Sequence, residues 1–399
     1  MKWAVLALCA LSVTAKAADS GWNTSWDGTL YGYVNNMNLR ADSVLNPGNK
    51  IAALPQRSDT AELRIGFKAQ NEVVRLTGRP ILSSRVMNNE FGTQQRNEGY
   101  FSQWQMRVKA GESWNVAAGR EVLNWGPAQF RSPSSPFYFD NGRNEPMREL
   151  IGMDAVKLSW TPDMQSSVNL AHIVRSGKDT IQMDMWRESW LAKFDLRGEN
   201  WAYGVVTVQV PRKHDFYGAH GQVAMTDALM LYGEIGSSVR AYGLNSSADA
   251  AQPFIVETPS SRSTASLAGA AYTFEDGKSL SAEYLHESGG YTAAEENAYF
   301  ARAVGTPDFA LGMAPRLLGR DYLHMVWQSY LLGENDYWRL MYTRNLGDGS
   351  NELSGYGEAV LASHLSIYAL VLLPIGNERQ EFSTLYSSSV TAGVKIAMP

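Results

Sequence analysis

The segment Ser387-Ser-Ser-Val390-Thr-Ala-Gly393-Val-Lys-Ile396-Ala-Met398-Pro399 alternates between apolar and polar side chains from Ser389 onward. One parity is apolar and the other polar: Val390, Ala392, Val394, Ile396 and Met398 against Ser389, Thr391, Gly393 and Lys395. A β-strand turns successive side chains to opposite faces, so this pattern predicts a strand with one apolar and one polar face. Such a strand needs an apolar environment on one side and a polar one on the other.

The N-terminal residues predict a cleaved export signal. A basic start at Lys2 is followed by a short apolar run from Ala4 to Val13 and by Ala15-Lys16-Ala17, a small-x-small cleavage site. The apolar run is too short for a transmembrane helix. We therefore expect a signal peptide at residues 1–17 and one mature domain at residues 18–399. Because the sole cysteine, Cys9, lies in the signal, the mature chain is expected to have no disulfide framework.

Composition excludes several classes of protein. Loss of residues 1–17 removes two lysines and no acidic residue, so the net charge changes from −5 to −7, which gives no indication of nucleic acid as a partner. The mean hydropathy is −0.27, and no later segment approaches the roughly 18 apolar residues of a spanning helix. A transmembrane β-barrel remains compatible, because alternation hides lipid-facing residues from a hydropathy average. The 12 Trp and 19 Tyr residues suit either its aromatic girdles or a sandwich core.

The connections between alternating segments differ in length in a regular way. Eight are short: 70–71, 111–112, 162–165, 198–199, 226–227, 275–278, 333–336 and 362–363. The connections between these are mostly longer: 41–57, 82–98, 121–153, 176–186, 211–214, 239–263, 288–319, 347–351 and 374–385. Outer-membrane barrels have short periplasmic turns and longer extracellular loops, whereas a soluble sandwich has no reason to sort its connections. The regular alternation of short and long connections therefore favours a barrel.

The predicted fold is all-β: a transmembrane antiparallel β-barrel of 18 strands, with 16 as the alternative, located in the outer membrane of a Gram-negative bacterium. Residues 18–27 are expected to be a periplasmic arm, and residues 293–303 a short surface helix. The first strand, near 29–39, is expected to pair with the closing strand at 386–398. The spacing of Thr391, Gly393, Ile396 and Met398 resembles the terminal signal of such barrels. The expected partners are thus outer-membrane lipid and the barrel-assembly machinery.

Alternation also predicts which charged residues face the lumen. Up to Arg197 the inward positions are mostly basic, and after it they are mostly acidic, with Glu234, Glu283, Glu287 and Glu358 among them. A wall of one sign concentrates ions of the other sign in a low-dielectric tube, so one side of the pore is expected to attract anions. The alternative is that these charges form ordinary ion pairs across neighbouring strands.

The long connection at residues 121–153 is rich in Pro, Gly, aromatic residues and both charges. Its length and composition indicate a functional loop that folds into the lumen and narrows the pore. Arginine side chains there could bind carboxylates or phosphates through paired N–H groups. A surface loop held by internal Arg–Glu pairs is the alternative. The predicted substrate-binding residues on the wall and the loop are Arg64, Arg75, Arg79, Arg107, Lys109, Arg120, Trp125, Arg131, Arg143 and Arg148.

The start of this connection, Gly119-Arg120 followed by Trp125-Gly126-Pro127 and a Ser/Pro/Asn-rich run, resembles the Wzi-like capsule-assembly barrels and related exopolysaccharide-associated barrels. The resemblance implies an 18-stranded barrel with a role in attachment or export of polysaccharide. We therefore expect passage, export or surface attachment of an anionic polysaccharide. The alternatives are a porin for small solutes and a non-conducting surface or accessory barrel.

Enzyme activity is not expected. The sequence has no Gly-x-Ser-x-Gly, His-Glu-x-x-His or glycine-rich phosphate-binding motif, and its histidines lack metal-ligand spacing. The adjacent His214-Asp215 is typical of a polar surface in the absence of a matching acidic pair. The sequence thus predicts no catalytic residues, no metal site and no cofactor.

Overall fold

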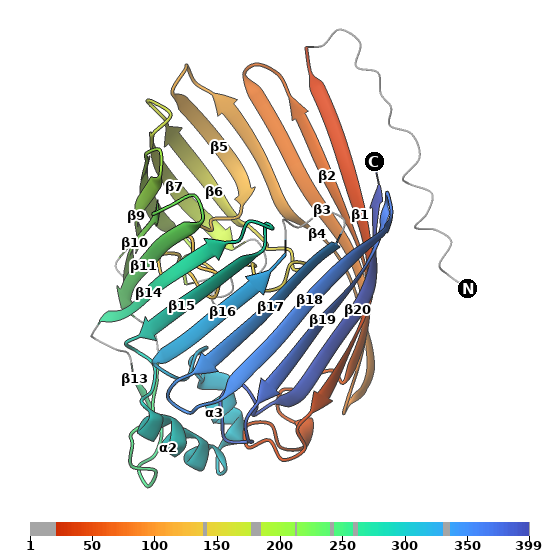
Figure 1. Ribbon diagram of the computed structural model, residues 1–399, viewed down its shortest axis with the longest axis vertical. Coiled ribbons are helices and arrows are strands. Elements are labelled where there is room, and N and C mark those ends of the chain that lie inside the picture. The colour runs from red at the N-terminus through yellow and green to blue at the C-terminus, as the bar shows by residue number, and fades with distance from the viewer. Residues whose placement is uncertain are drawn as a thin grey trace.

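The computed structural model describes residues 21–138, 142–176, 185–211, 214–239, 243–257, 262–329 and 336–398. Eighteen strands in these ranges form one closed antiparallel sheet (Figure 1). They are β1 (Asn23–Leu39), β2 (Arg57–Gln70), β3 (Val74–Asn89), β4 (Gly92–Lys109), β5 (Trp114–Glu121), β6 (Met153–Trp160), β7 (Ser166–Ser176), β8 (Ser189–Arg197), β9 (Trp201–Val210), β10 (His214–Ala224), β11 (Leu229–Val239), β14 (Arg262–Thr273), β15 (Ser279–Glu287), β16 (Asp321–Gln328), β17 (Asp336–Asn345), β18 (Asn351–Ala362), β19 (Leu365–Ile375) and β20 (Tyr386–Met398). The predicted barrel of 18 strands is confirmed, and the alternative of 16 is wrong.

The barrel closes where β1 meets β20. The register runs from Gly28 opposite Met398 to Leu39 opposite Tyr386, so the expected pairing of first and last strands is confirmed. Val394 is 41% exposed on the outer face, whereas Thr391 is buried on the inner one. The arm expected at 18–27 is partly wrong, because β1 already begins at Asn23 and pairs with β2 there. The expected signal peptide lies outside the described residues.

The two rims of the barrel differ as the connection lengths predicted. Tight turns occupy one rim, and the other carries α2 (Ala293–Ala303), α3 (Pro307–Met313), the short η1 (Pro47–Asn49) and the small pair β12 (Gly243–Asn245) and β13 (Ile255–Glu257) (Figure 1). The expected helix at 293–303 is confirmed, and Thr292 begins it with a capping box that includes Glu295. Because outer-membrane barrels carry their longer connections on the extracellular side, we call the second rim extracellular.

One long connection predicted for this rim is wrong. Residues 82–98 form the ends of β3 and β4, which meet in a tight hairpin between Asn89 and Gly92. Both faces of this hairpin are largely polar, with Gln94, Gln95 and Arg96 exposed in succession. The apolar alternation that marks a lipid-facing strand is therefore missing, although the backbone pairing continues.

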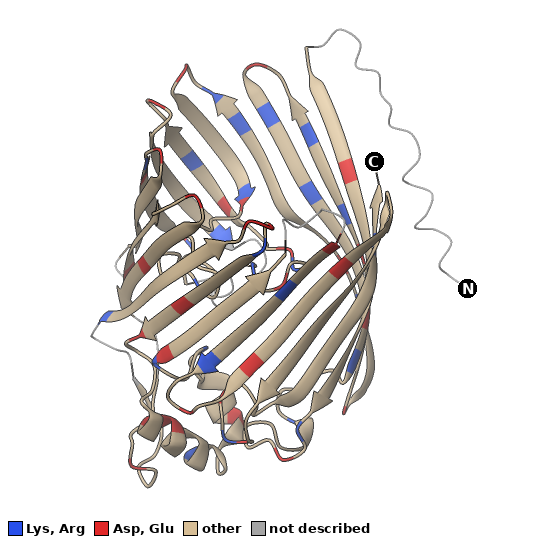
Figure 2. Cartoon of the chain, viewed as in Figure 1, with Lys and Arg blue, Asp and Glu red and all other residues tan. Residues whose placement is uncertain are grey.

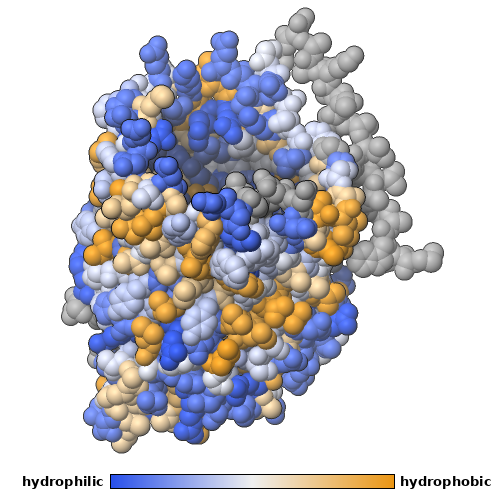
Figure 3. Space-filling model, in the orientation of Figure 1, coloured by the Kyte–Doolittle hydropathy of each residue, from blue (hydrophilic) through white to orange (hydrophobic). Residues whose placement is uncertain are grey.

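An apolar band encircles the strands. In Figure 3 hydrophobic residues gather across the middle of the visible wall and polar residues at its two ends. Aromatic side chains border the band near the turns. Trp114 of β5 and Trp160 of β6 lie opposite each other in register, and their rings stack with centroids 5.8 Å apart. Such a band with aromatic borders is the outer surface of an outer-membrane barrel. None of the helices in the described part of the chain is long and apolar enough to cross a membrane.

Candidate functional site

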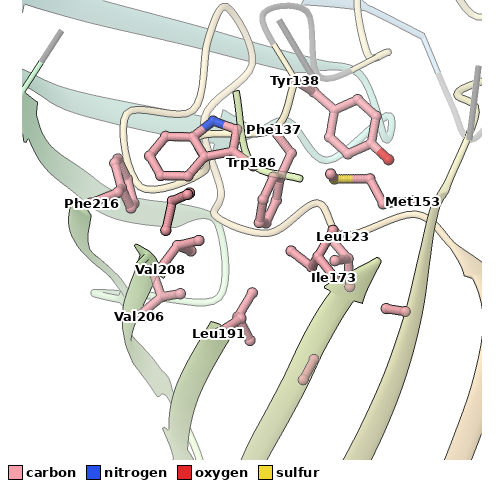
Figure 4. Packing of buried hydrophobic residues seen from close by; sticks show 13 residues of the cluster. Leu123, Phe137, Tyr138, Met153, Ile173, Trp186, Leu191, Val206, Val208 and Phe216 are labelled. Carbon is pink, nitrogen blue, oxygen red and sulfur yellow. The ribbon is translucent and has the colours of Figure 1, made fainter. Parts of the chain in front are cut away.

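Residues 122–138 and 142–152, between β5 and β6, lie inside the barrel; we call them the inserted loop. Leu123, Phe137 and Tyr138 of the loop are buried in one cluster with inward side chains of β7 to β10 (Figure 4). Phe137 meets Trp186 edge to face, with ring centroids 6.2 Å apart. The prediction that this connection folds into the lumen is confirmed, and its apolar half covers one wall of the barrel.

Two carboxylates on distant strands hold the tip of the inserted loop. Glu234 of β11 accepts hydrogen bonds from the backbone N–H groups of Ala128 (2.8 Å) and Ser134 (3.1 Å) and from the hydroxyls of Ser132 (2.5 Å) and Ser134 (2.7 Å). Glu283 of β15 accepts from the N–H groups of Gln129 (2.6 Å) and Phe130 (2.8 Å) and from the Tyr232 hydroxyl (2.7 Å).

Both carboxylates are almost fully buried, with exposed fractions of 4% for Glu234 and 2% for Glu283. Charge-assisted bonds of this kind are about twice as strong as neutral ones. Two of the predicted lumen acids, Glu234 and Glu283, are thus anchors for the loop.

Two predicted substrate-binding residues of the inserted loop instead stabilise its shape. The guanidinium of Arg143 donates to the carbonyl oxygens of Gly126, Pro127 and Ala128, the last two from one nitrogen at 2.5 and 2.8 Å. The indole N–H of Trp125 donates to Ser134 O at 2.6 Å. Their donors are directed at backbone carbonyls of the same loop, so both residues fix the turn that Glu234 and Glu283 then bind.

Glycine allows the inserted loop to approach the wall. Gly126 has φ +90°, a left-handed conformation, and a Cβ there would meet the Glu234 carboxylate. On β11, a Cβ at Gly236 would collide with the carbonyl oxygen of Pro133. The loop backbone therefore lies directly on the strand at Gly236.

We expect Gly236→Ala to displace the inserted loop, because the new methyl group needs the space of Pro133 O. Overpacking of this kind costs about 1–3 kcal/mol. Limited trypsin digestion at Arg143 should become faster than in the native protein. Gly357→Ala, in a strand and with no atom within 4 Å of its Cβ, is the matched control and should digest like the native protein. Equal digestion of both variants would show that the loop does not depend on this contact.

The basic wall divides into paired and unpaired residues. Arg64 bonds to Glu62 at 2.5 Å, and Arg79 lies 3.3 Å from Glu149 of the inserted loop. Among the described residues, by contrast, no salt bridge involves Arg75, Arg107 or Lys109. Arg75 and Arg107 face each other across β3 and β4 in register, and Arg75 and Lys109 are exposed to the lumen. Figure 2 shows this basic wall on β2 to β5, whereas acidic segments are frequent on β11 to β18.

Ion pairs account for several other lumen charges. Lys157 pairs with Glu121, Lys193 with Asp195, and Lys395 with Glu358 at 2.8 Å. The alternative that lumen charges form ordinary ion pairs is therefore correct for these residues and for Arg64, although the pairs Lys193–Asp195 and Arg64–Glu62 each lie within one strand. A net basic stretch remains between the inserted loop and the turn rim.

The inserted loop leaves two cavities in the barrel. One, of about 420 Å³, lies between it and the wall of β1 to β4 and β18 to β20, and is lined by Arg64, Arg85, Arg148, Tyr33, Tyr100 and Tyr356 among others. The second, of about 350 Å³, lies towards the extracellular rim and includes Arg131, Arg316 and Glu287. Burial lowers the pKa of Arg131 to about 10, so its side chain stays charged at neutral pH.

Arg120 does not belong to this site. It pairs in register with Trp104, which is 40% exposed on the outer face, and with Asp154. Its guanidinium bonds Asp154 at 2.8 and 3.0 Å, and Arg175 bonds the same carboxylate at 2.7 Å. The register thus places Arg120 on the outward parity of the wall, and its prediction as a lumen residue is wrong.

Sequence reasoning did not single out the tyrosines of the first cavity. Tyr31 and Tyr33 of β1 share one parity, and Tyr356 and Tyr368 of β18 and β19 are buried beside them. Arg64 lies over the Tyr31 ring at 4.3 Å from the centroid. The signal was the alternation Tyr31-Gly32-Tyr33 itself. Among the described residues, no cluster of three His, Cys, Asp or Glu side chains could hold a metal ion.

No protein-family model matches the chain, and no curated protein matches it by sequence. Solved structures similar to it include Pseudomonas aeruginosa OccK5 (OpdH), with a TM-score of 0.58, 8% identity and coverage of 94% of this chain and 98% of that one. Pseudomonas aeruginosa OprD aligns with a TM-score of 0.53 and 10% identity, over 94% and 95% of the two chains. Acinetobacter baumannii OccAB2 gives 0.57 and 9%, over 94% and 98%. At these identities the likeness shows the shared fold.

Two expectations are corrected by this comparison. The similar structures are porins of the OccK and OprD groups, so the resemblance to Wzi-like capsule barrels is wrong. The motif misled because Gly119 and Gly126, both with positive φ, and Trp125 serve the local geometry of an inserted loop. The expected passage, export or attachment of polysaccharide is wrong for the same reason. The inserted loop also leaves cavities of a few hundred Å³, the size of small-ligand sites.

Proposed function

We propose that the protein is an outer-membrane porin that admits small solutes and favours anions. The proposal includes export through the cleaved signal at residues 1–17 and insertion in the outer membrane of a Gram-negative bacterium. One arrangement supports it most. The inserted loop is held inside the barrel, where it narrows the lumen. The basic wall continues past this loop with Arg75, Arg107 and Lys109, which form no salt bridge among the described residues.

Arginine and lysine would guide the solute along this wall. Arg85 and Arg148 are exposed beside the larger cavity, and Arg64 and Arg79 follow at the inserted loop. Arg75, Arg107 and Lys109 lie nearer the turn rim. A succession of cations in a narrow tube raises the local concentration of anions and lowers the barrier between neighbouring sites. Catalysis is not part of the proposal, because solute passage needs no bond to be made or broken.

Reconstitution of the full mature chain in planar bilayers tests the proposal. We expect discrete conductance steps and, under a salt gradient, a reversal potential of the sign that indicates preference for chloride over potassium. A matched preparation of heat-unfolded protein should give no steps. An absence of steps from the native chain, and also from a variant lacking residues 124–149, would contradict the proposal and favour a non-conducting surface barrel.

A further inference from the structure

Three extracellular segments meet in one packed unit, which we call the cap. It consists of residues 288–320 with α2 and α3, the turn at 346–350, and the connection at 376–385. Tyr291, Tyr299, Phe300 and Leu318 form its buried apolar cluster together with Leu45 and Leu244 of two neighbouring extracellular connections. Figure 1 shows α2 and α3 beyond the ends of the strands at the extracellular rim. The cap thus has a small core outside the barrel wall, which it shares with these two connections.

Two glutamates lie at the centre of the cap. Glu296 of α2 is 1% exposed, and Asn345, at the end of β17, is 0% exposed. The Asn345 amide nitrogen donates to Glu296 Oε1 at 2.7 Å and to Glu381 Oε2 at 2.8 Å. Because one nitrogen serves both carboxyl groups, the two acids from different segments lie close together. Glu296 Oε2 has no hydrogen-bond partner among the described residues.

The groups around this pair favour a neutral state of Glu296. On the turn, Asp348 accepts the Glu381 N–H at 2.6 Å and adds a third acid. From β16 the Tyr322 hydroxyl donates to Glu381 at 2.6 Å, and Leu318 N–H does so at 2.8 Å. Arg320 of the cap pairs with a different acid, Glu295, at 3.5 Å.

Arg131 of the inserted loop, with Arg316 beside it, is in electrostatic reach of Glu287 and Glu381. No cation among the described residues contributes comparably at Glu296. Burial, with the nearby Asp348 and Glu381, raises the pKa of Glu296 to about 8. Burial likewise raises the pKa of Glu381 to about 7, against the opposing bonds from Tyr322, Leu318 and Asn345.

We propose that Glu296 and Glu381 form a pH-sensitive latch, which holds the cap on the extracellular rim while the pair carries a proton and releases it when both carboxyl groups are ionised. When both are charged, two buried like charges lie side by side at the Asn345 amide, and Glu296 Oε2 has no donor among the described residues, an arrangement that costs free energy. Movement of the cap into water removes this cost, because each carboxylate is then hydrated.

The direction of the pH response follows from the raised pKa values. An acid whose pKa is higher in the docked cap than in the released one binds its proton more tightly when docked. Docking is therefore strongest in acid and weakens as the pH rises from the ordinary value near 4.5 towards about 8, where the docked Glu296 also ionises. One unit of pKa corresponds to a tenfold change in this equilibrium.

Spin-label distance measurements on the full mature chain test the latch directly. Without Cys9 the mature chain has no native cysteine, so labels can be placed at Ala301→Cys on α2 and Asn88→Cys on the wall, both exposed positions. We expect one narrow distance distribution at about pH 5 and at least a tenfold larger population of longer distances at about pH 9. With Glu296→Gln and Glu381→Gln added, the distribution should stay narrow at both pH values.

Glu378→Gln, at a partly exposed acid of the same connection, is the control and should respond to pH like the native chain. If the double variant fails to insert, Glu296→Gln alone should reduce the response. A native distribution that does not change with pH would overturn the latch, as would a Gln variant that broadens like the native chain. The measured distance does not depend on conduction, so failure of the latch and failure of the porin proposal are separate outcomes.

Discussion

Replacing Glu234 with alanine is expected to release the inserted loop and to raise the single-channel conductance severalfold. The carboxylate is the shared acceptor for four donors of the loop. Its removal leaves the N–H groups of Ala128 and Ser134 buried without an acceptor, at about 1–3 kcal/mol each. Adding Glu283→Ala removes the acceptor of Gln129 and Phe130 as well, and should enlarge the effect.

The barrel itself should remain intact in these variants, because the wall is held by its own backbone pairing. Glu358→Gln is the matched control: Glu358 also faces inward, but it bonds Lys395 and Tyr356 of the wall and not the inserted loop. Its conductance should equal the native value. A Glu234→Ala channel with native conductance and native trypsin resistance at Arg143 would show that the apolar cluster around Phe137 is sufficient to hold the loop without Glu234.

Reversing the charge of Arg75 and Arg107 together is expected to convert an anion-selective channel into a cation-selective one. The two residues are register partners on the lumen side, so Arg75→Glu with Arg107→Glu changes the local charge from +2 to −2 at one level of the pore. A change of about 1.4 kcal/mol in an ion's energy alters the permeability ratio tenfold. One unit charge at 4 Å near a protein surface exceeds that, at about 4 kcal/mol.

Reversal potentials under a salt gradient measure this ratio, and high salt should reduce the effect by screening. The control is Arg344→Glu, which makes the same kind of change on an exposed residue whose parity on β17 is that of the outward Leu340. Selectivity should change in the lumen variant alone. An equal change in both would mean that net charge, and not the basic wall, determines selectivity.

Much of the fold was predictable because lipid imposes a simple rule on each strand. Val390, Val394 and Ile396 alternate with inward residues at the closing strand, and the parity of connection length then oriented every hairpin. The rule fails where no lipid is present: the polar hairpin of β3 and β4 has no apolar face, so its sequence predicts a loop. Arg120 was misassigned although Trp114, Val116 and Ala118 share its parity.

The site was less predictable, because its contacts join residues far apart in the chain. Glu234 and Glu283 lie a hundred or more residues along the chain from the loop residues that they bind, and Ala128 bonds Glu234 across a separation of 106. Alternation places a carboxylate inside the barrel, but it does not indicate whether the partner is a lysine on the next strand or a backbone N–H. Arg143 was likewise expected to grip a solute, since sequence alone does not show carbonyl oxygens converging on it.

The seam between β1 and β20 has a consequence for how the molecule assembles. Asn35 donates to Ser389 and Thr391 across sequence separations of 354 and 356, among the most distant contacts that the chain contains. Until the last strand arrives, β1 and β19 each present a row of unpaired backbone groups, which invites pairing with other chains. We therefore expect closure, the most non-local pairing of the barrel, to be a slow step of folding. A chain that stops short of Tyr386 would be an open sheet with two unpaired edges.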